Sequence, residues 1–405
     1  MSMFRMASIA LLAACGSAPS LPSPMTASTV VGRDFEAWAS VIRSRHPNLS
    51  FKLPRADFDQ MVQSLKSDEA TLGETAFLAR WWRIVSAIGD EHTWVHMPEL
   101  GLMLPVRTRR FPDGLYVVDT DAANADLLGS RVDDIAGIDA LQFQERLRPY
   151  VTSSVEPFFR VTSAELLWSA LKLWQGAGLL PEANQYTLKF TKADGSTVQR
   201  TLHTTMTAPP THVSTLLRDE APAQNYFMRE LTPQHVVYVR YRRCVDMPAH
   251  RWSTFANEII AALEHTANQK LVLDLRGNGG GDSRLIQPLL DWLSSSSYNT
   301  KERLVVLIDA GVFSSALLNA VTLRSALNGT LVGDDAGQAL SHYGEVVVFS
   351  LPSGRQAYNS TKRFDVGPVG TSDPFHAPLE PDVRIVETIA DFRAGNDPVL
   401  TEVLR

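Results

Sequence analysis

The chain has 405 residues, of which 44% are hydrophobic and 20% are charged, and its formal net charge is -6 at pH 7. This composition is that of an ordinary globular protein, and the length allows two or three domains with hydrophobic cores. The acidic balance argues against a general nucleic-acid binder. The chain has two cysteines, Cys15 and Cys244, which excludes a disulfide framework and a CxxC metal site. No apolar run reaches the length that spans a membrane.

The N-terminus has the pattern of a targeting segment. Residues 6–14 form a short apolar stretch behind Arg5, and the sequence Leu-Ala-Ala-Cys ends at Cys15, before a run rich in serine and proline. This resembles a bacterial lipoprotein signal peptide. The resemblance implies a signal over residues 1–15, a linker over 16–30, lipidation of Cys15, and a protein anchored by acyl chains in the bacterial cell envelope. An ordinary secretory signal with an incidental cysteine is the alternative.

Residues 31–100 are predicted to form an N-terminal helical region, with the helices over residues 33–90. Apolar side chains recur at helical spacing, most strongly over residues 75–88, where Trp81 and Trp82 lie among other large apolar residues. We interpret these aromatic side chains as core. Gly89 and Asp90 end the pattern, and residues 91–96 are expected to be extended.

Two further regions precede the C-terminal half. Residues 101–155 are predicted to hold short strands and a helix over 140–147, and the sequence LLGSRVDDIAGIDA at 127–140 resembles the end of a PDZ-like module. Residues 156–228 form a connecting region with an amphipathic helix over 162–174. A hairpin is indicated there, because Ala-Asp-Gly-Ser at 193–196 separates two alternating runs.

From residue 229 to 405, strand patterns alternate with helix patterns. Apolar strands are predicted at 235–241, 270–275, 303–308, 331–332, 345–351 and 383–386, and helices at 255–263, 284–293 and 315–327. Such alternation indicates an α/β layer with a largely parallel sheet.

Within this region, residues 270–283 read KLVLDLRGNGGGDS. An apolar strand with one acid, Asp274, leads into Gly277-Asn278-Gly279-Gly280-Gly281, and Ser283 is a candidate helix cap. Four glycines in five positions allow a sharp turn with backbone N–H groups close to a ligand. A plain tight turn and an oxyanion hole both fit, whereas the phosphate-loop pattern GxxxxGK[ST] is absent.

Residues 304–315 read LVVLIDAGVFSS and contain a candidate nucleophile. A buried strand ends at Asp309, and Ser314 precedes a helix rich in alanine and leucine. A serine there presents its hydroxyl at the helix N-terminus, where the dipole favours a neighbouring oxyanion. Alternatively, Ser314 or Ser315 is only an N-cap.

Taken together, the segments DLRGNGGG, VLIDAGVFSSALLNAV, LVGDDAG and LEPDV, in this order, resemble the S41 family of tail-specific, C-terminal-processing serine peptidases, which includes the tricorn core protease. DEHTWV at 90–95 is similar to the family's early D-x-H motif. The resemblance implies a ClpP/crotonase-like α/β core over 229–405 and a serine-type endopeptidase acting on protein or peptide substrates without metal or cofactor. It places the nucleophile at Ser314 and the oxyanion hole at Gly280 and the N–H of Ser315.

The chain departs from the tail-specific branch at the general base. That branch uses a lysine shortly after the next strand, but residues 333–339 read GDDAGQA. The tricorn-like branch uses an early histidine, and His92 is the matching position. An imidazole with a pKa near ~6.5 suits this role. Lys362, the sole lysine between Ser314 and the C-terminus, is the rival base.

A third group is expected to orient the base. The tricorn-like pattern favours Asp373, with Glu380 in reserve, and Asp90 or Glu91 beside His92 could also serve. The missing lysine keeps open a second function, a non-catalytic ligand- or peptide-binding protein on the same scaffold.

A zinc site at His92 and His96 is disfavoured, because HTWVH lacks the glutamate of HExxH. No role is predicted for Tyr343 or His376, and the pattern predicts no oligomeric state.

Overall fold

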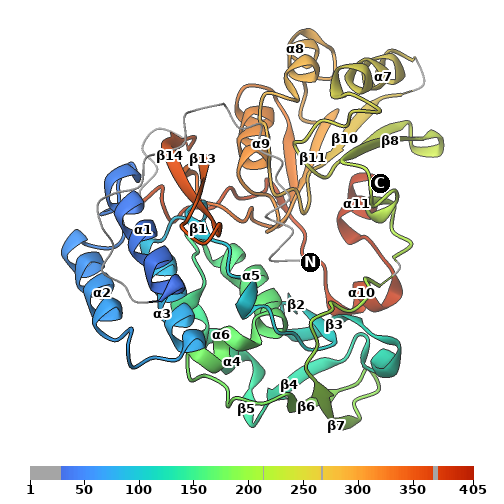
Figure 1. Cartoon of the computed structure of the whole chain (residues 1–405). Coiled ribbons are helices and arrows are strands. Elements are labelled where there is room, and N and C mark those ends of the chain that lie inside the picture. Colours follow the sequence, from blue (N-terminus) through green and yellow to red (C-terminus); the bar gives the residue numbers. More distant parts are fainter. Residues whose placement is uncertain (1–28, 213, 266–267, 368–372) are drawn as a thin grey trace.

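The computed structural model describes residues 29–212, 214–265, 268–367 and 373–405 (Figure 1). The predicted signal peptide, most of the predicted linker and Cys15 lie outside the described residues. Within those ranges, no helix combines the length and the apolar character that crossing a membrane requires.

The first region holds three helices, as the apolar spacing predicted. They are α1 (Val30–Arg45), α2 (Arg55–Ser67) and α3 (Glu74–Ile88). Their aromatic side chains form the core between them: the ring of Phe35 lies 5.4 Å from that of Trp81, and Trp38 lies 5.7 Å from Trp81, centroid to centroid. Gly89, with φ of 78°, ends α3 and turns the chain towards the extended segment that carries His92.

An antiparallel sheet follows. Its main strands, in spatial order, are β2 (Val106–Phe111), β3 (Gly114–Thr120), β4 (Arg131–Ile135), β6 (Gln185–Thr191) and β7 (Thr197–His203), with β5 (Ile138–Asp139) paired to β4. The accompanying helices are α4 (Ala140–Arg146), α5 (Glu156–Ser169) and α6 (Leu171–Gly176). Because β4 pairs with β6, strands from both sides of residue 155 share one sheet. The PDZ-like module stays a prediction.

The C-terminal half is built on a six-stranded sheet with the order β15-β12-β11-β10-β9-β8. Its strands are β8 (Tyr226–Leu231), β9 (Val236–Tyr241), β10 (Lys270–Asp274), β11 (Leu304–Ile308), β12 (Thr330–Gly333) and β15 (Val383–Arg384). In this sheet β9, β10, β11, β12 and β15 run parallel, and β8 adds an antiparallel edge. The predicted α/β layer with a largely parallel sheet is confirmed.

Helices cover both faces of this sheet (Figure 1). α7 (Trp252–Glu264), α8 (Gln287–Ser295) and α9 (Ser315–Ser325) pack on one face, and α11 (Pro398–Val403), which follows α10 (Ile389–Ala394), packs on the other. The predicted cap at Ser283 is wrong: α8 begins only at Gln287, with Ile286 at its N-cap. Residues between the glycine turn and α8 form turns instead, and Pro288 sits in the first turn of the helix.

A small third sheet links the early segment to the core. β1 (Trp94–Val95) pairs with β14 (Gln356–Asp365), which forms a hairpin with β13 (Ser341–Ser350). The rings of Trp94 and Tyr358 stack with centroids 4.0 Å apart. Figure 1 shows this sheet between α1 and α9. Since β1 begins two residues after His92, the pairing of β1 with β14 determines the position of that histidine.

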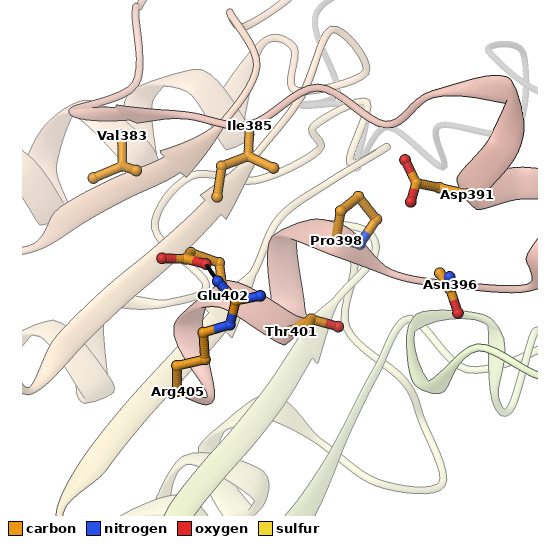
Figure 2. Close-up of a pocket in the computed structure, with 8 residues that line it drawn as sticks. All are labelled: Val383, Ile385, Asp391, Asn396, Pro398, Thr401, Glu402 and Arg405. Atoms are coloured by element: carbon orange, nitrogen blue, oxygen red, sulfur yellow. Dashed lines mark hydrogen bonds and ion pairs between the residues drawn. The ribbon is translucent and has the colours of Figure 1, made fainter.

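A surface pocket of about 520 Å³ lies beside β15, α10 and α11 (Figure 2). It is lined by Val383, Ile385, Asp391, Asn396, Pro398, Thr401, Glu402 and Arg405. None of these residues is a candidate site residue, so the pocket is separate from the chemistry predicted from the sequence.

Candidate active site

Ser314 lies in the sharp turn between β11 and α9. Its backbone is left-handed, with φ of 54° and ψ of -126°, although the residue has a Cβ. Such conformations cost of order 1–3 kcal/mol and persist where the surrounding structure imposes them, often at functional sites. Ser314 occupies the N-cap position of α9, but its side chain makes no capping hydrogen bond. The interpretation of Ser314 as a helix cap is therefore wrong.

The hydroxyl of Ser314 instead meets His92. The Nε2 atom of His92 lies 2.9 Å from Oγ of Ser314, across 222 residues of sequence. His92 is 7% exposed, and its ring stacks on that of Phe313, with centroids 4.8 Å apart. The fold thus brings together the two residues predicted as nucleophile and base, at a distance that suits proton transfer.

The other side of the imidazole is held by backbone and amide groups. The His92 ring is hydrogen-bonded to the backbone of Tyr343, and Nε2 of Gln338 lies 3.4 Å from its Nδ1. Oε1 of Gln338 accepts a 2.7 Å hydrogen bond from the backbone N–H of Ser314. Gln338 is fully buried and touches both members of the pair. Sequence reasoning missed Gln338 and gave Tyr343 no role. For Gln338 the available signal was a polar side chain in the stretch 333–339, where the family lysine was sought.

Burial sets the protonation state of the base. Desolvation lowers the pKa of His92 below its ordinary value, although the negative charge of Asp90 and the hydrogen bond to the Tyr343 backbone oppose this shift. His92 is therefore neutral at neutral pH, which is the form that can accept a proton from a serine hydroxyl.

Asp90 holds the backbone of the base rather than its ring. Its Oδ1 accepts a 3.0 Å hydrogen bond from the N–H of His92, and its Oδ2 accepts from His46 Nε2 at 3.0 Å and from Thr93 Oγ1 at 2.6 Å. Burial alone would raise the pKa of Asp90, but these donors and the nearby histidines lower it to about 2. Asp90 is thus a buried carboxylate that fixes the turn carrying His92.

Glu91 also faces away from the imidazole. Its carboxylate accepts a hydrogen bond from the backbone N–H of Ser154, and burial raises its pKa, against the opposing effects of that bond and of Lys52. Glu91 therefore anchors the loop before α5.

The structure does not bring Asp373 to the base. Its carboxylate accepts from Nδ1 of His376 at 2.8 Å, and its side chain is 65% exposed. The reserve candidate Glu380 offers its backbone carbonyl to Arg324 at 2.7 Å. Throughout the described ranges, no carboxylate hydrogen-bonds to the His92 ring. The prediction that an acid near the final strand orients the base is thus corrected: Tyr343 and Gln338 occupy that position.

The rival base is also remote. The side chain of Lys362 is 58% exposed and lies 3.6 Å from Glu345 in an ion pair on the β13–β14 hairpin. Among the residues with assigned positions, no cluster of three or more histidine, cysteine, aspartate or glutamate side chains could hold a metal ion. In the described geometry, His92 and not Lys362 lies against the hydroxyl of Ser314.

The glycine turn packs directly on the nucleophile. Gly280 has φ of 99°, and a Cβ on it would lie 2.7 Å from Cβ of Ser314 and 2.9 Å from the backbone nitrogen of Ser315. Only glycine fits this close approach. The N–H of Gly280 donates to Oδ1 of Asn278 at 2.9 Å, and Oγ of Ser315 donates to the carbonyl of Gly281 at 2.6 Å. The turn and the helix start thus meet where the oxyanion hole was predicted, and the oxyanion role stays a prediction.

Buried polar contacts hold this turn rigid. Arg276 bridges Asp274 at 2.6 Å and Asp397, the N-cap of α11, at 2.8 Å, and all three side chains are almost completely buried. Nδ2 of Asn278 donates to the carbonyl of Tyr241 at 2.8 Å. Arg276 and Asn278 therefore tie the glycine turn to α11 and to the end of β9.

Comparisons with known proteins identify the fold. No family model matches the sequence, and no curated protein matches it either. Among solved structures, mature CPAF complexed with lactacystin is 13% identical, with 93% of this chain and 97% of that chain covered and a TM-score of 0.64. Another structure of mature CPAF is also 13% identical, with coverage of 93% and 96% and a TM-score of 0.61. At such identity the likeness concerns the fold alone: the chain has the fold of mature CPAF.

Proposed function

We propose that the protein is a serine-type endopeptidase that hydrolyses peptide bonds of protein substrates, with Ser314 as nucleophile and His92 as general base. The observation that carries this proposal is the 2.9 Å contact between Oγ of Ser314 and Nε2 of His92, made by a half-buried serine in a strained turn. A nucleophile bonded to a base, with that base held by a further group, is the arrangement that activates a hydroxyl.

The contacts define a role for each group. Nε2 of His92 takes the hydroxyl proton as Oγ of Ser314 bonds to the substrate carbonyl carbon, and the imidazolium then gives that proton to the leaving amine. In the second half-reaction His92 takes a proton from water as the water oxygen bonds to the acyl carbon. The bond from that carbon to Oγ of Ser314 then breaks, the imidazolium returns the proton to Oγ, and a carboxylic acid leaves. For Nε2 to accept a proton, Nδ1 carries the ring hydrogen and donates it to the backbone of Tyr343, and the amide of Gln338 packs beside the same edge of the ring.

The negative charge on the carbonyl oxygen needs backbone donors. We assign this role to the N–H of Ser315, the first residue of α9, together with the N–H of Gly280, whose hydrogen bond to Asn278 would be shared with or yielded to the substrate. The N-terminus of α9 adds a favourable dipole.

A fluorophosphonate probe tests the proposal directly. The purified protein is expected to form a covalent adduct that mass spectrometry maps to Ser314, whereas Ser314→Ala is not labelled. Ser315→Ala is the matched control, since its hydroxyl donates to Gly281 rather than to the base. Labelling at Ser315 or at no serine would overturn the assignment, and the latter result would favour a non-catalytic binding protein on this scaffold. A peptide library then defines the cleavage preference of the labelled enzyme.

The cell-envelope location is part of the same proposal. It rests on the Leu-Ala-Ala-Cys sequence that ends at Cys15 and on the serine- and proline-rich run behind it. Expressed in a bacterium, the protein is expected to partition into the detergent phase, and Cys15→Ser is expected to move it into the aqueous phase. Equal partitioning of the two proteins would refute lipid anchoring and leave the peptidase proposal unaffected.

A further inference from the structure

His46 lies behind the candidate base and has no place in the reaction described above. It is the C-cap residue of α1, and its side chain is completely buried, as is that of Asp90. A buried histidine at a helix end is usually a packing residue with satisfied hydrogen bonds. Two of its contacts, however, are with Asp90 and Tyr343, which both contact His92.

The first contact runs through Asp90. Nδ1 of His46 accepts a 3.2 Å hydrogen bond from the N–H of Asn48, so the ring proton lies on Nε2 and is donated to Oδ2 of Asp90 at 3.0 Å. The other oxygen of Asp90 accepts from the backbone N–H of His92 at 3.0 Å. His46 therefore fixes the carboxylate that fixes the main chain of the base.

The second contact runs through Tyr343. The rings of His46 and Tyr343 lie 5.4 Å apart, centroid to centroid, and the backbone of Tyr343 is hydrogen-bonded to the His92 ring. Tyr343 belongs to β13, whereas Asp90 follows α3, so these two supports come from elements far apart in sequence. Among the contacts of the described residues, His46 is the side chain other than His92 that touches both Asp90 and Tyr343.

We propose that His46 is a positioning residue for the general base, acting through Asp90 on the main chain of His92 and through Tyr343 on its ring. The inference rests on the proposed peptidase function. A carboxylate without its donor can reorient, and a shift of about 1 Å in a catalytic group costs on the order of 100-fold in rate. Loss of His46 is thus expected to slow the chemical step and to leave substrate binding nearly unchanged.

The test compares His46→Leu with His46→Gln. Leucine fills the space but donates no hydrogen bond, whereas the amide of glutamine can donate to Asp90. His250→Gln is the matched control, because His250 also makes a 3.0 Å contact with a carboxylate, that of Glu258, but on the surface. The rate of fluorophosphonate labelling at Ser314, kcat and KM of peptide cleavage, and Tm are measured for each variant from pH 5 to 9.

We expect His46→Leu to lower the labelling rate and kcat by about 10- to 100-fold on the high-pH plateau, with KM within about 3-fold of the wild type. His46→Gln is expected to recover most of the rate, and His250→Gln to match the wild type. A packing role alone would lower Tm in His46→Leu without changing the labelling rate of the folded protein, and that result would overturn the inference. Should His46→Leu fail to fold, His46→Met, which also lacks a donor, takes its place and is compared with His46→Gln below the Tm of both. Equal labelling rates in these two variants would refute positioning, and a rate at least about 10-fold lower in His46→Met would support it.

These outcomes separate the two proposals. If the wild type is labelled at Ser314 and both His46 variants label equally fast, the peptidase proposal stands and the role of His46 is refuted. If the wild type is not labelled at Ser314, both proposals fail, since there is then no activated serine for His46 to support.

Discussion

The backbone N–H of Ser314 donates a 2.7 Å hydrogen bond to Oε1 of Gln338, which lies 24 residues further along the chain. The same amide places its nitrogen 3.4 Å from Nδ1 of His92. One buried side chain thus contacts the main chain of the nucleophile and the ring of the base. This link supports the left-handed backbone of Ser314, which no capping interaction of its own side chain sustains.

The first prediction concerns that link. Gln338→Ala removes the acceptor of the Ser314 N–H and leaves a buried donor unpaired, so it is expected to lower kcat/KM by about 10- to 100-fold and to reduce stability by about 1–3 kcal/mol. Steady-state kinetics and thermal melting measure both effects. Gln287→Ala is the control, since the side chain of Gln287 is exposed at the start of α8 and donates to Asp291 of the same helix. Wild-type kinetics in Gln338→Ala would refute a role for the amide.

The second prediction uses the glycine turn. Gly280→Ala would place a Cβ 2.7 Å from Cβ of Ser314 and strain a residue with φ of 99°, so the turn and the nucleophile must separate. We expect a loss of about 100-fold or more in the labelling rate. Gly279→Ala is the matched control one residue away, because nothing lies within 4 Å of a Cβ there. Equal losses in the two variants would mean that the turn's general flexibility matters, and not its approach to Ser314.

The third prediction separates the candidate bases and acids. His92→Ala is expected to reduce activity by several orders of magnitude, because Ser314 then has no proton acceptor. Lys362→Ala and Asp373→Asn are expected to keep most of it, since Lys362 pairs with Glu345 and Asp373 with His376 on the surface. Peptide cleavage assays on the three variants measure this. A dead Lys362→Ala variant would place the chain with the serine–lysine peptidases, and a dead Asp373→Asn variant would restore the acid to the site.

The fourth prediction concerns pH and activity. Because burial lowers the pKa of His92 from its ordinary value of 6.5, and only neutral imidazole accepts a proton, kcat/KM should rise with pH and level off through an apparent pKa below 6.5. A pH–rate profile of peptide cleavage tests this. An apparent pKa above 7 would be inconsistent with a buried histidine base.

Stability should follow pH in the same direction. Burial, and the charge of the nearby His92, lower the pKa of His342 to about 4, against an unfolded value near 6.5. Between these values the unfolded state binds more protons than the folded state, so the free energy of unfolding decreases as pH falls from about 6.5 to 4. Melting curves across this range test the sign, and His342→Gln should flatten the dependence. A Tm that rises on acidification would contradict it.

The sequence alone predicted the α/β core and the two residues of the candidate catalytic pair, Ser314 and His92. Apolar runs fixed β10 and β11, because strands buried on both faces are apolar without interruption. The order of the motifs, read through the family resemblance, indicated Ser314 and His92 as candidates before any contact between them was known. For Ser314 this was possible because a strand, a sharp turn and a helix start are local features. Four glycines in five positions indicated a sharp turn, and the placing of Gly280 beside Ser314 was implied by the family resemblance.

Only the tertiary structure decided what supports the pair. Tyr343 and His46 carry no local signal, and Gln338 carries only that of a polar side chain in the stretch 333–339, because an amide, a backbone group and a buried histidine gain a role only from neighbours far along the chain. β14 was missed for a similar reason: its residues are mostly polar, and it is held by pairing with β13 and β1 rather than by an apolar face. The same physics displaced Asp373, since a carboxylate that is exposed and paired on the surface has no cause to enter the buried environment of His92.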